Sequence, residues 1–291
     1  MSMPLSSLTK TCAARLPRLN RQVVTILVLV VLSAASFNTW AVEADNEIWR
    51  SIRYSLFKNR PVTLDTTGEV LVLKTPKRAQ DSAVVPIGVI SKIAQTPERH
   101  IQKIWLVVDR NPSPVGAIFT LSPNSGRADI DTRIRVQEFT HIRAIAQLND
   151  GSVYMARNFL RASGGCSAPA AKDMERAMKN IGRMKVNLWG KPVAGKPLRA
   201  QLMVSHPNIT GLAEQSSQAY SAPHFVRHLE IAYGDEVILQ ADIDFSISEN
   251  PNFRFWFTPQ DHAKELQVRI VDTEDKKYTK TVAIKPFRET Q

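Results

Sequence analysis

The chain contains 291 residues and carries a formal net charge of +11. This positive excess can favour acidic partners or anionic small molecules, but it does not determine the fold. The sequence has no long run of lysine and arginine and no platform of basic and aromatic residues, so we expect no nucleic-acid partner.

An export signal is predicted at the amino terminus. Four basic residues precede an apolar run from Val23 to Phe37, and the first acidic residue is Glu43. A membrane-spanning helix needs about 20 apolar residues, so this run suits a secretory signal better than a stable membrane anchor. Small residues at Ala41 and Ala44 offer two cleavage sites. We expect residues 1–41 to be the cleaved signal peptide of a periplasmic protein, and an uncleaved anchor is the alternative.

A first domain is predicted over residues 45–162. It opens with a helix that ends before Pro61, because apolar residues recur at helical spacing at Ile48, Trp49, Ile52 and Leu56. Short segments rich in Val and Ile follow, separated by Pro, Asn, Asp and Gly, at residues 70–73, 84–90, 101–108, 115–121, 128–136, 141–148 and 152–160. Short strands at this spacing predict a β-sandwich.

The next segment contains Cys166, the one cysteine that remains after export, because Cys12 lies in the signal. A lone thiol has no partner for a disulfide within the chain, so its own chemistry or an intermolecular bond accounts for it. Gly164 and Gly165 reduce side-chain bulk and backbone restraint beside the sulfur. We therefore expect Cys166 to be solvent-accessible and mobile, and an inert linker cysteine is the alternative.

A short helix is predicted over residues 170–181, directly after the cysteine. Its amino end would lie close to Cys166, where the helix dipole favours a thiolate, so we expect a modestly lowered pKa for the thiol. Met174 and Met178 share one side of this helix and would anchor it. Residues 163–182 are thus interpreted as a cysteine arm followed by a linker helix.

A second domain is predicted over residues 183–291. Strand-like segments recur at residues 198–204, 225–233, 236–243, 252–257, 266–271 and 278–284. Phe253, Phe255 and Phe257 share one face of their strand, and we expect that face to be buried rather than to bind a ligand.

Two other groups of residues give weaker signals. His224 and His228 have the spacing of metal ligands on a helix, but on a strand they lie about 13 Å apart, too far for one metal ion. Asp242 and Asp244 share a strand face, and we expect both to be solvated without a role in acid–base catalysis. We therefore predict no catalytic residue, no metal site and no cofactor.

Several motifs resemble those of the SoxY and SoxZ families of sulfur-oxidation proteins. Ser163-Gly164-Gly165-Cys166, at the end of the first domain, looks like the Gly-Gly-Cys carrier arm of SoxY. The second domain resembles SoxZ in the order of four motifs: His206-Pro207, Thr210-Gly211, Ala222-Pro223-His224-Phe225 and Ser248-Glu249-Asn250-Pro251-Asn252-Phe253-Arg254-Phe255. The resemblance covers nearly all of the chain after the signal. It is typical of a fused SoxYZ carrier, similar to those associated with quinoprotein dehydrogenases.

The resemblance implies a covalent carrier rather than an enzyme. Cys166 would hold a sulfur-containing group while periplasmic sulfur-oxidation enzymes, or components of a quinoprotein dehydrogenase system, load, oxidise or release it. In SoxY this cysteine lies near a free carboxyl end, whereas here the chain continues, so the arm is tethered at both ends. Two alternatives remain: a thiol-dependent enzyme of the sulfurtransferase or peroxidase type, and a non-catalytic binding or assembly protein for a quinoprotein dehydrogenase.

The predicted fold is mainly β, with two immunoglobulin-like β-sandwich domains joined by a linker rich in Gly, Ser and Ala and by a short helix. Both domains have aromatic and aliphatic strand faces that must be buried against another surface. Fusion in one chain gives each domain a very high effective concentration near the other. We therefore expect the two sandwiches to pack on each other, as the separate SoxY and SoxZ chains do.

Overall fold

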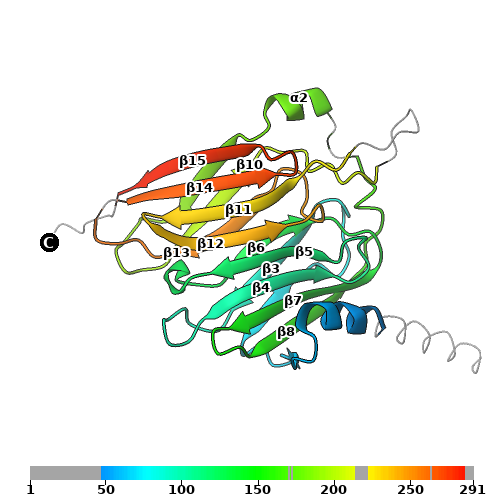
Figure 1. Ribbon diagram of the computed structural model, residues 1–291, viewed down its shortest axis with the longest axis horizontal. Coiled ribbons are helices and arrows are strands. Elements are labelled where there is room, and N and C mark those ends of the chain that lie inside the picture. The colour runs from blue at the N-terminus through cyan, green and yellow to red at the C-terminus, as the bar shows by residue number, and fades with distance from the viewer. Residues whose placement is uncertain (1–46, 170, 172, 214–221, 263, 286–291) are drawn as a thin grey trace, which may run out of the picture. The chain divides into compact units, whose positions relative to one another are not determined.

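Two β-sheets that lie one over the other are the main elements of the chain between residues 48 and 285 (Figure 1). This computed structural model describes residues 47–169, 171, 173–213, 222–262 and 264–285. The expected signal peptide, residues 1–41, lies outside these ranges. Within them, no helix is both long enough and apolar enough to cross a membrane.

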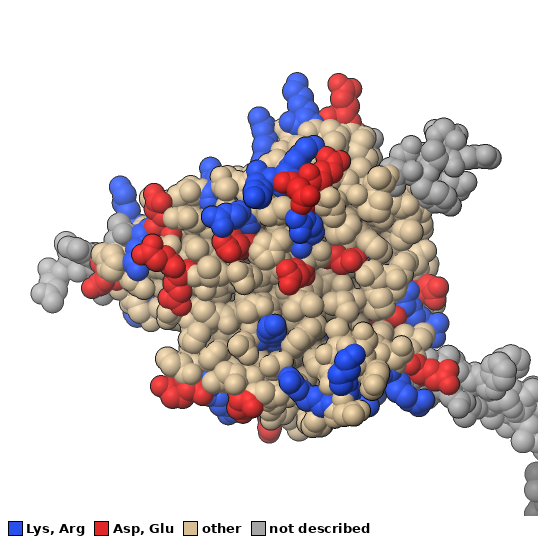
Figure 2. Space-filling model, viewed as in Figure 1, with Lys and Arg blue, Asp and Glu red and all other residues tan. Residues whose placement is uncertain are grey.

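The larger sheet has nine strands, in the order β1-β8-β7-β4-β5-β12-β11-β14-β15. Their bounds are Thr63–Leu64 (β1), Val153–Leu160 (β8), Thr140–Leu148 (β7), Ile101–Val108 (β4), Val115–Leu121 (β5), Glu236–Ile243 (β12), Val226–Tyr233 (β11), Lys264–Asp272 (β14) and Lys277–Ile284 (β15). Figure 2 shows acidic and basic side chains mixed over the face seen in Figure 1, so positive charge does not dominate that face.

The smaller sheet has six strands, in the order β2-β3-β6-β13-β10-β9. Their bounds are Leu71–Lys74 (β2), Val85–Ser91 (β3), Ile130–Ile134 (β6), Asn252–Phe257 (β13), Leu198–Val204 (β10) and Met184–Trp189 (β9). The helical elements described are residues 47–57, the 3-10 turn η1 (Pro123–Ser125) and α2 (Met174–Lys179). The fold is therefore mainly β, as predicted.

Both sheets continue across the boundary between the two halves of the chain. In the larger sheet β5 pairs with β12, with Phe119 opposite Ala241, and in the smaller sheet β6 pairs with β13 at Asp131 and Arg254. Each half contributes strands to both sheets, as the two predicted sandwiches require. The halves are joined edge to edge through both sheets, which corrects the expectation that two separate sandwiches pack on each other. An edge strand leaves a row of unpaired N–H and C=O groups, and pairing two such edges satisfies both rows.

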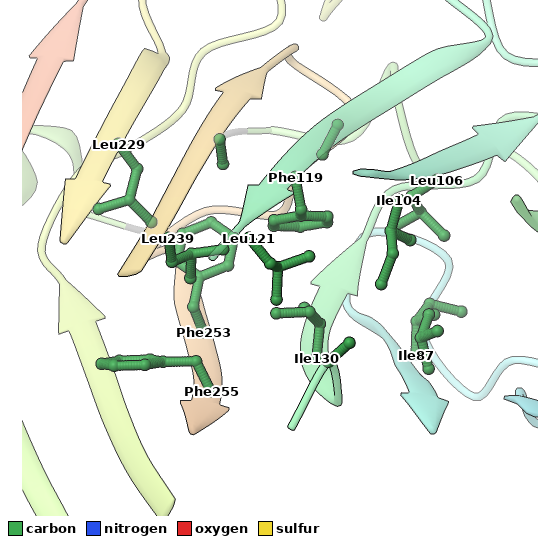
Figure 3. Packing of buried hydrophobic residues seen from close by; sticks show 14 of the residues in the cluster. Ile87, Ile104, Leu106, Phe119, Leu121, Ile130, Leu229, Leu239, Phe253 and Phe255 are labelled. Atoms are coloured by element: carbon green, nitrogen blue, oxygen red, sulfur yellow. The ribbon is translucent and has the colours of Figure 1, made fainter. Parts of the chain in front are cut away.

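A single apolar core lies between the sheets and spans both halves (Figure 3). The rings of Phe119 and Phe253 meet edge to face across the boundary, with centroids 6.2 Å apart. Phe253, Phe255 and Phe257 are all buried, as expected for one face of their strand. The two halves therefore share one core.

The predicted strands are present, and β1 and β9 are additional. The helix after the cysteine differs from its prediction over residues 170–181, because α2 covers only six residues. Met174 and Met178, which we expected to anchor it, are exposed. The cysteine therefore precedes a short surface helix rather than a packed one.

Candidate functional site

Cys166 lies in a short segment that follows β8 and runs beside the end of β6; we call residues 163–167 the cysteine arm. Two amides of the arm donate to backbone carbonyls: Gly164 to Gln137 at 2.8 Å and Gly165 to Val136 at 2.9 Å. The Cys166 N–H donates to the side-chain Oε1 of Gln137 at 3.0 Å. The backbone on the amino side of the sulfur is therefore held at three consecutive residues.

The second half of the chain holds the same cysteine from the other side. The hydroxyl of Thr210, itself buried, donates to the carbonyl of Cys166 at 2.7 Å. Cys166 is 0% exposed. The prediction of a solvent-accessible thiol is therefore wrong, because hydrogen bonds from both halves dock the arm at their boundary.

Gly165 is required here for close packing rather than for mobility. A Cβ atom at this position would lie 2.0 Å from the backbone oxygen of Ser82 and 2.8 Å from the backbone nitrogen of Val136. Gly164 has open space around it, but its φ of +77° favours glycine. The two glycines that we expected to make the arm flexible instead fit its docked conformation.

The docked thiol is a weak acid. Burial raises the pKa of Cys166 to about 12; the positive charge of Arg135 opposes this shift, and the carboxylate of Asp244 adds to it. We expected a lowered pKa from a helix dipole, but α2 begins at Met174, after its cap Asp173. The dipole acts only over the first turn, so it does not reach the sulfur. The thiol is therefore neutral at physiological pH.

Two charged side chains act on the arm. Arg135 is 0% exposed, and its guanidinium donates to the carbonyl of Gly165 at 3.3 Å and to that of Asn208 at 3.5 Å. Asp244 is half-buried, which corrects the expectation that it is solvated, and burial raises the pKa of its carboxyl group. Both groups influence Cys166 through their charge.

The loop that carries Thr210 is braced by a buried cluster of two histidines and an aspartate. The Oδ2 atom of Asp272 lies 3.0 Å from Nε2 of His224 and 3.7 Å from Nε2 of His206. Nδ1 of His206 accepts the N–H of Asn208 at 3.1 Å. Because Asn208 lies in the same loop as Thr210, this cluster helps to fix the group that holds the cysteine carbonyl.

The same cluster has the residue types of a metal site. The ligating atoms of His206, His224 and Asp272 lie within 4.8 Å of one another. However, Nδ1 of His206 accepts the Asn208 N–H, so Nε2 carries the proton of the neutral ring and cannot ligate a metal. Burial, together with the charge of His224, lowers the pKa of His206 to about 4 and keeps its ring neutral. We therefore interpret the cluster as a hydrogen-bonded support.

This cluster was not predicted from the sequence. The spacing of His224 and His228 suggested a pair, whereas the structure brings His224 to His206 and Asp272, from distant parts of the chain. His228 instead lies 3.0 Å from the exposed carboxylate of Asp242. The motifs around both buried histidines were visible in the sequence, but their contact with Asp272 depends on the fold.

Parts of the chain have low similarity to solved structures. The sulfur carrier protein SoxY from Chlorobium limicola f thiosulfatophilum is 21% identical with a TM-score of 0.35, and the match covers 42% of this chain and 99% of that one. A superoxide reductase (neelaredoxin) from Ignicoccus hospitalis is 15% identical with a TM-score of 0.31, covering 34% of this chain and 93% of its own. No curated protein matches the chain.

Two family models match in tandem. The model of the sulfur oxidation protein SoxY matches residues 54–166, and that of the sulphur oxidation protein SoxZ matches residues 186–283. The first match ends at Cys166, and the second begins at β9. The chain therefore belongs to the SoxYZ type of sulfur oxidation proteins, with a SoxY domain and a SoxZ domain fused in one polypeptide.

Proposed function

We propose that this protein is a periplasmic carrier that holds sulfur-containing intermediates covalently on Cys166 during the oxidation of sulfur compounds. The observation that carries the proposal is the position of Cys166. It is the last residue of the SoxY match, and hydrogen bonds from both the SoxY and the SoxZ domain hold it. A lone cysteine at the junction of two sulfur oxidation domains is suited to carry their cargo.

The docked conformation suits the resting state of such a carrier. The thiolate is the reactive form of cysteine, and a thiol with a pKa of about 12 forms almost none at neutral pH. Loading therefore requires the arm to leave its site, so that the thiolate forms in water and attacks a sulfur donor. The side chain of Gln137 holds the arm by three hydrogen bonds, with Cys166 and Ser167, and that of Thr210 holds it by one; these side-chain bonds can break without disturbing either sheet.

The same geometry disfavours a thiol-dependent enzyme. Such an enzyme needs an activating base beside its cysteine. Here the charges that act on the thiol come from Arg135 and Asp244, and burial outweighs the effect of the arginine. The chemistry on the cargo is therefore assigned to partners, namely sulfur-oxidation enzymes or components of a quinoprotein dehydrogenase system.

Replacement of Cys166 in the host tests the carrier function. Cys166→Ser should abolish sulfur-compound oxidation, whereas Ser167→Ala, a change to the next residue, should retain it. Full activity of Cys166→Ser would favour an assembly protein instead.

A second assay separates a carrier from a sulfurtransferase. The purified protein receives thiosulfate as donor and cyanide as sulfur acceptor. Cyanide takes the outer sulfur as thiocyanate and leaves the Cys166 thiolate. A carrier needs a partner enzyme to be loaded again, so it yields at most one equivalent of thiocyanate per chain. A sulfurtransferase reloads itself from thiosulfate, with sulfite as the leaving group, and yields many.

A further inference from the structure

Arg135 is a buried cation in direct contact with the cysteine arm. Its backbone is fixed just after β6, where its N–H donates to the carbonyl of Ser246 at 2.7 Å and its carbonyl accepts Nδ2 of Asn111 at 2.9 Å. Its Nη1 donates to the carbonyl of Gly165, the residue before Cys166. The guanidinium is thus held in place beside the residue that carries the sulfur.

The hydrogen-bonding capacity of this guanidinium is poorly used. It has five N–H donors, yet its two bonds, to the carbonyls of Gly165 and Asn208, are 3.3 and 3.5 Å long, beyond the usual range for N–H···O. Its Nε atom is buried and has no hydrogen-bond partner among the described residues. Glu249 and Asp81 influence Arg135 through their charge, but no carboxylate in the described part of the chain is hydrogen-bonded to it. Within that part, the charge of this buried cation is therefore not matched by a directly bonded anion.

Loading the cysteine changes what the guanidinium contacts. Because Cys166 is fully buried, a group attached to its sulfur has to displace protein atoms that now cover it. The attached group has to lift the arm, which takes the carbonyl of Gly165 away from Nη1 of Arg135. The released donors then lie beside the new group. Charge-assisted hydrogen bonds are roughly twice as strong as neutral ones, so an anionic oxygen is favoured over the carbonyl that it replaces.

We propose that Arg135 binds the anionic end of the sulfur compound carried on Cys166. This inference rests on the proposed carrier function and deepens it by assigning to Arg135 the recognition of cargo that ends in a sulfonate or a similar oxyanion, in preference to neutral sulfur groups. Arg135 is thereby a residue that determines cargo specificity. It holds the loaded arm against the protein until a partner enzyme draws it away.

Two reagents provide the cargo for a test. The thiolate of Cys166, after its proton passes to water, attacks an inner sulfur of tetrathionate; thiosulfate leaves with the electron pair, and the cysteine sulfur carries an anionic –S–SO₃⁻ group. With methyl methanethiosulfonate, the thiolate attacks the methylthio sulfur and methanesulfinate leaves. The cysteine then carries a neutral –SCH₃ group. The two adducts differ in charge at the same attachment point.

The measurement is the rate at which a small phosphine reductant removes each adduct. Arg135→Gln is compared with wild type and with Arg133→Gln, a control from the same strand region whose guanidinium donates to the carbonyl of Asn250 instead. The ratio of neutral to anionic release rates should be about tenfold higher in wild type than in Arg135→Gln, as expected for the loss of a hydrogen bond to a charged group. Arg133→Gln should keep the wild-type ratio.

A second variant covers the case in which Arg135→Gln does not fold. Arg135→Lys keeps the charge but loses the planar fork of donors, so its ratio should fall between the two. An unchanged ratio in a folded Arg135 variant would overturn the inference. Failure of the proposed carrier function would show in a different measurement: protein isolated from the host would carry no adduct on Cys166.

Discussion

Replacing Thr210 with valine should release the docked cysteine arm. The hydroxyl of Thr210 donates to the carbonyl of Cys166 at 2.7 Å and accepts the N–H of Leu212 at 3.1 Å. Valine has the same shape but makes neither bond. A neutral hydrogen bond contributes about 0.5–1.5 kcal/mol, so the loss of the bond to the arm should shift the equilibrium roughly two- to tenfold towards the released state.

Alkylation of Cys166 by iodoacetamide at pH 8 measures this shift. A thiol with a pKa of about 12 forms thiolate in about one molecule in 10⁴ at this pH, whereas an exposed thiol with a pKa of about 8.5 is about one quarter ionised. The docked thiol therefore reacts more slowly than the released one by a factor on the order of 10³. The observed rate follows the released fraction, so Thr210→Val should raise it roughly two- to tenfold.

Thr132 offers a matched control. It is a buried threonine whose hydroxyl has no hydrogen-bond partner among the described residues. Thr132→Val should therefore leave the alkylation rate unchanged. The reasoning would be refuted if wild-type Cys166 reacted as fast as the thiol of an unfolded peptide, or if Thr210→Val reacted at the wild-type rate.

Three further predictions concern the arm and its support. Gly165→Ala should increase the alkylation rate of Cys166 more than Gly164→Ala does, because only the former places a Cβ against backbone atoms; equal effects would contradict this packing. The raised pKa of Cys166 contributes stability that is complete below its unfolded pKa, about 8.5, and is lost as pH rises towards about 12. Urea unfolding should therefore show a decline in stability over that range that is shallower in Cys166→Ser, and identical slopes would argue against a buried thiol. The lowered pKa of His206 contributes stability that is complete above about pH 6.5 and is lost as pH falls through about 4. An NMR titration of its ring protons should give a midpoint near 4, and a midpoint near 6.5 would show that the ring is not buried.

The strands could be predicted from local patterns, but their pairing could not. Alternation of apolar residues at 252–257 and the turn residues between strands identify the elements with little help from the rest of the chain. These patterns do not indicate which strand edges pair with each other. The pairing of β5 with β12 joins residues from opposite halves, and no feature of either strand alone distinguishes this arrangement from two closed sandwiches.

The same limit applies to the site, where the cysteine could be predicted but its surroundings could not. Cys166 could be identified from its motif, because a lone thiol that follows two glycines has no disulfide partner after the expected signal peptide is removed. Its burial could not, since Gly165 owes its identity to the backbone of Ser82, distant in sequence. Arg135 and Thr210 are equally remote from the motif, and only the joined sheets bring them to the arm. The glycines beside Cys166 indicated a flexible arm, but contacts from distant residues hold the arm in its docked position.

The intact mass of the protein, purified without reductant from its host during growth on a reduced sulfur compound, tests the carrier function most directly. We predict an added mass that a reductant removes and that peptide mass spectrometry assigns to Cys166. The added mass should be absent from Cys166→Ser. An unmodified free thiol under every growth condition would contradict the carrier function.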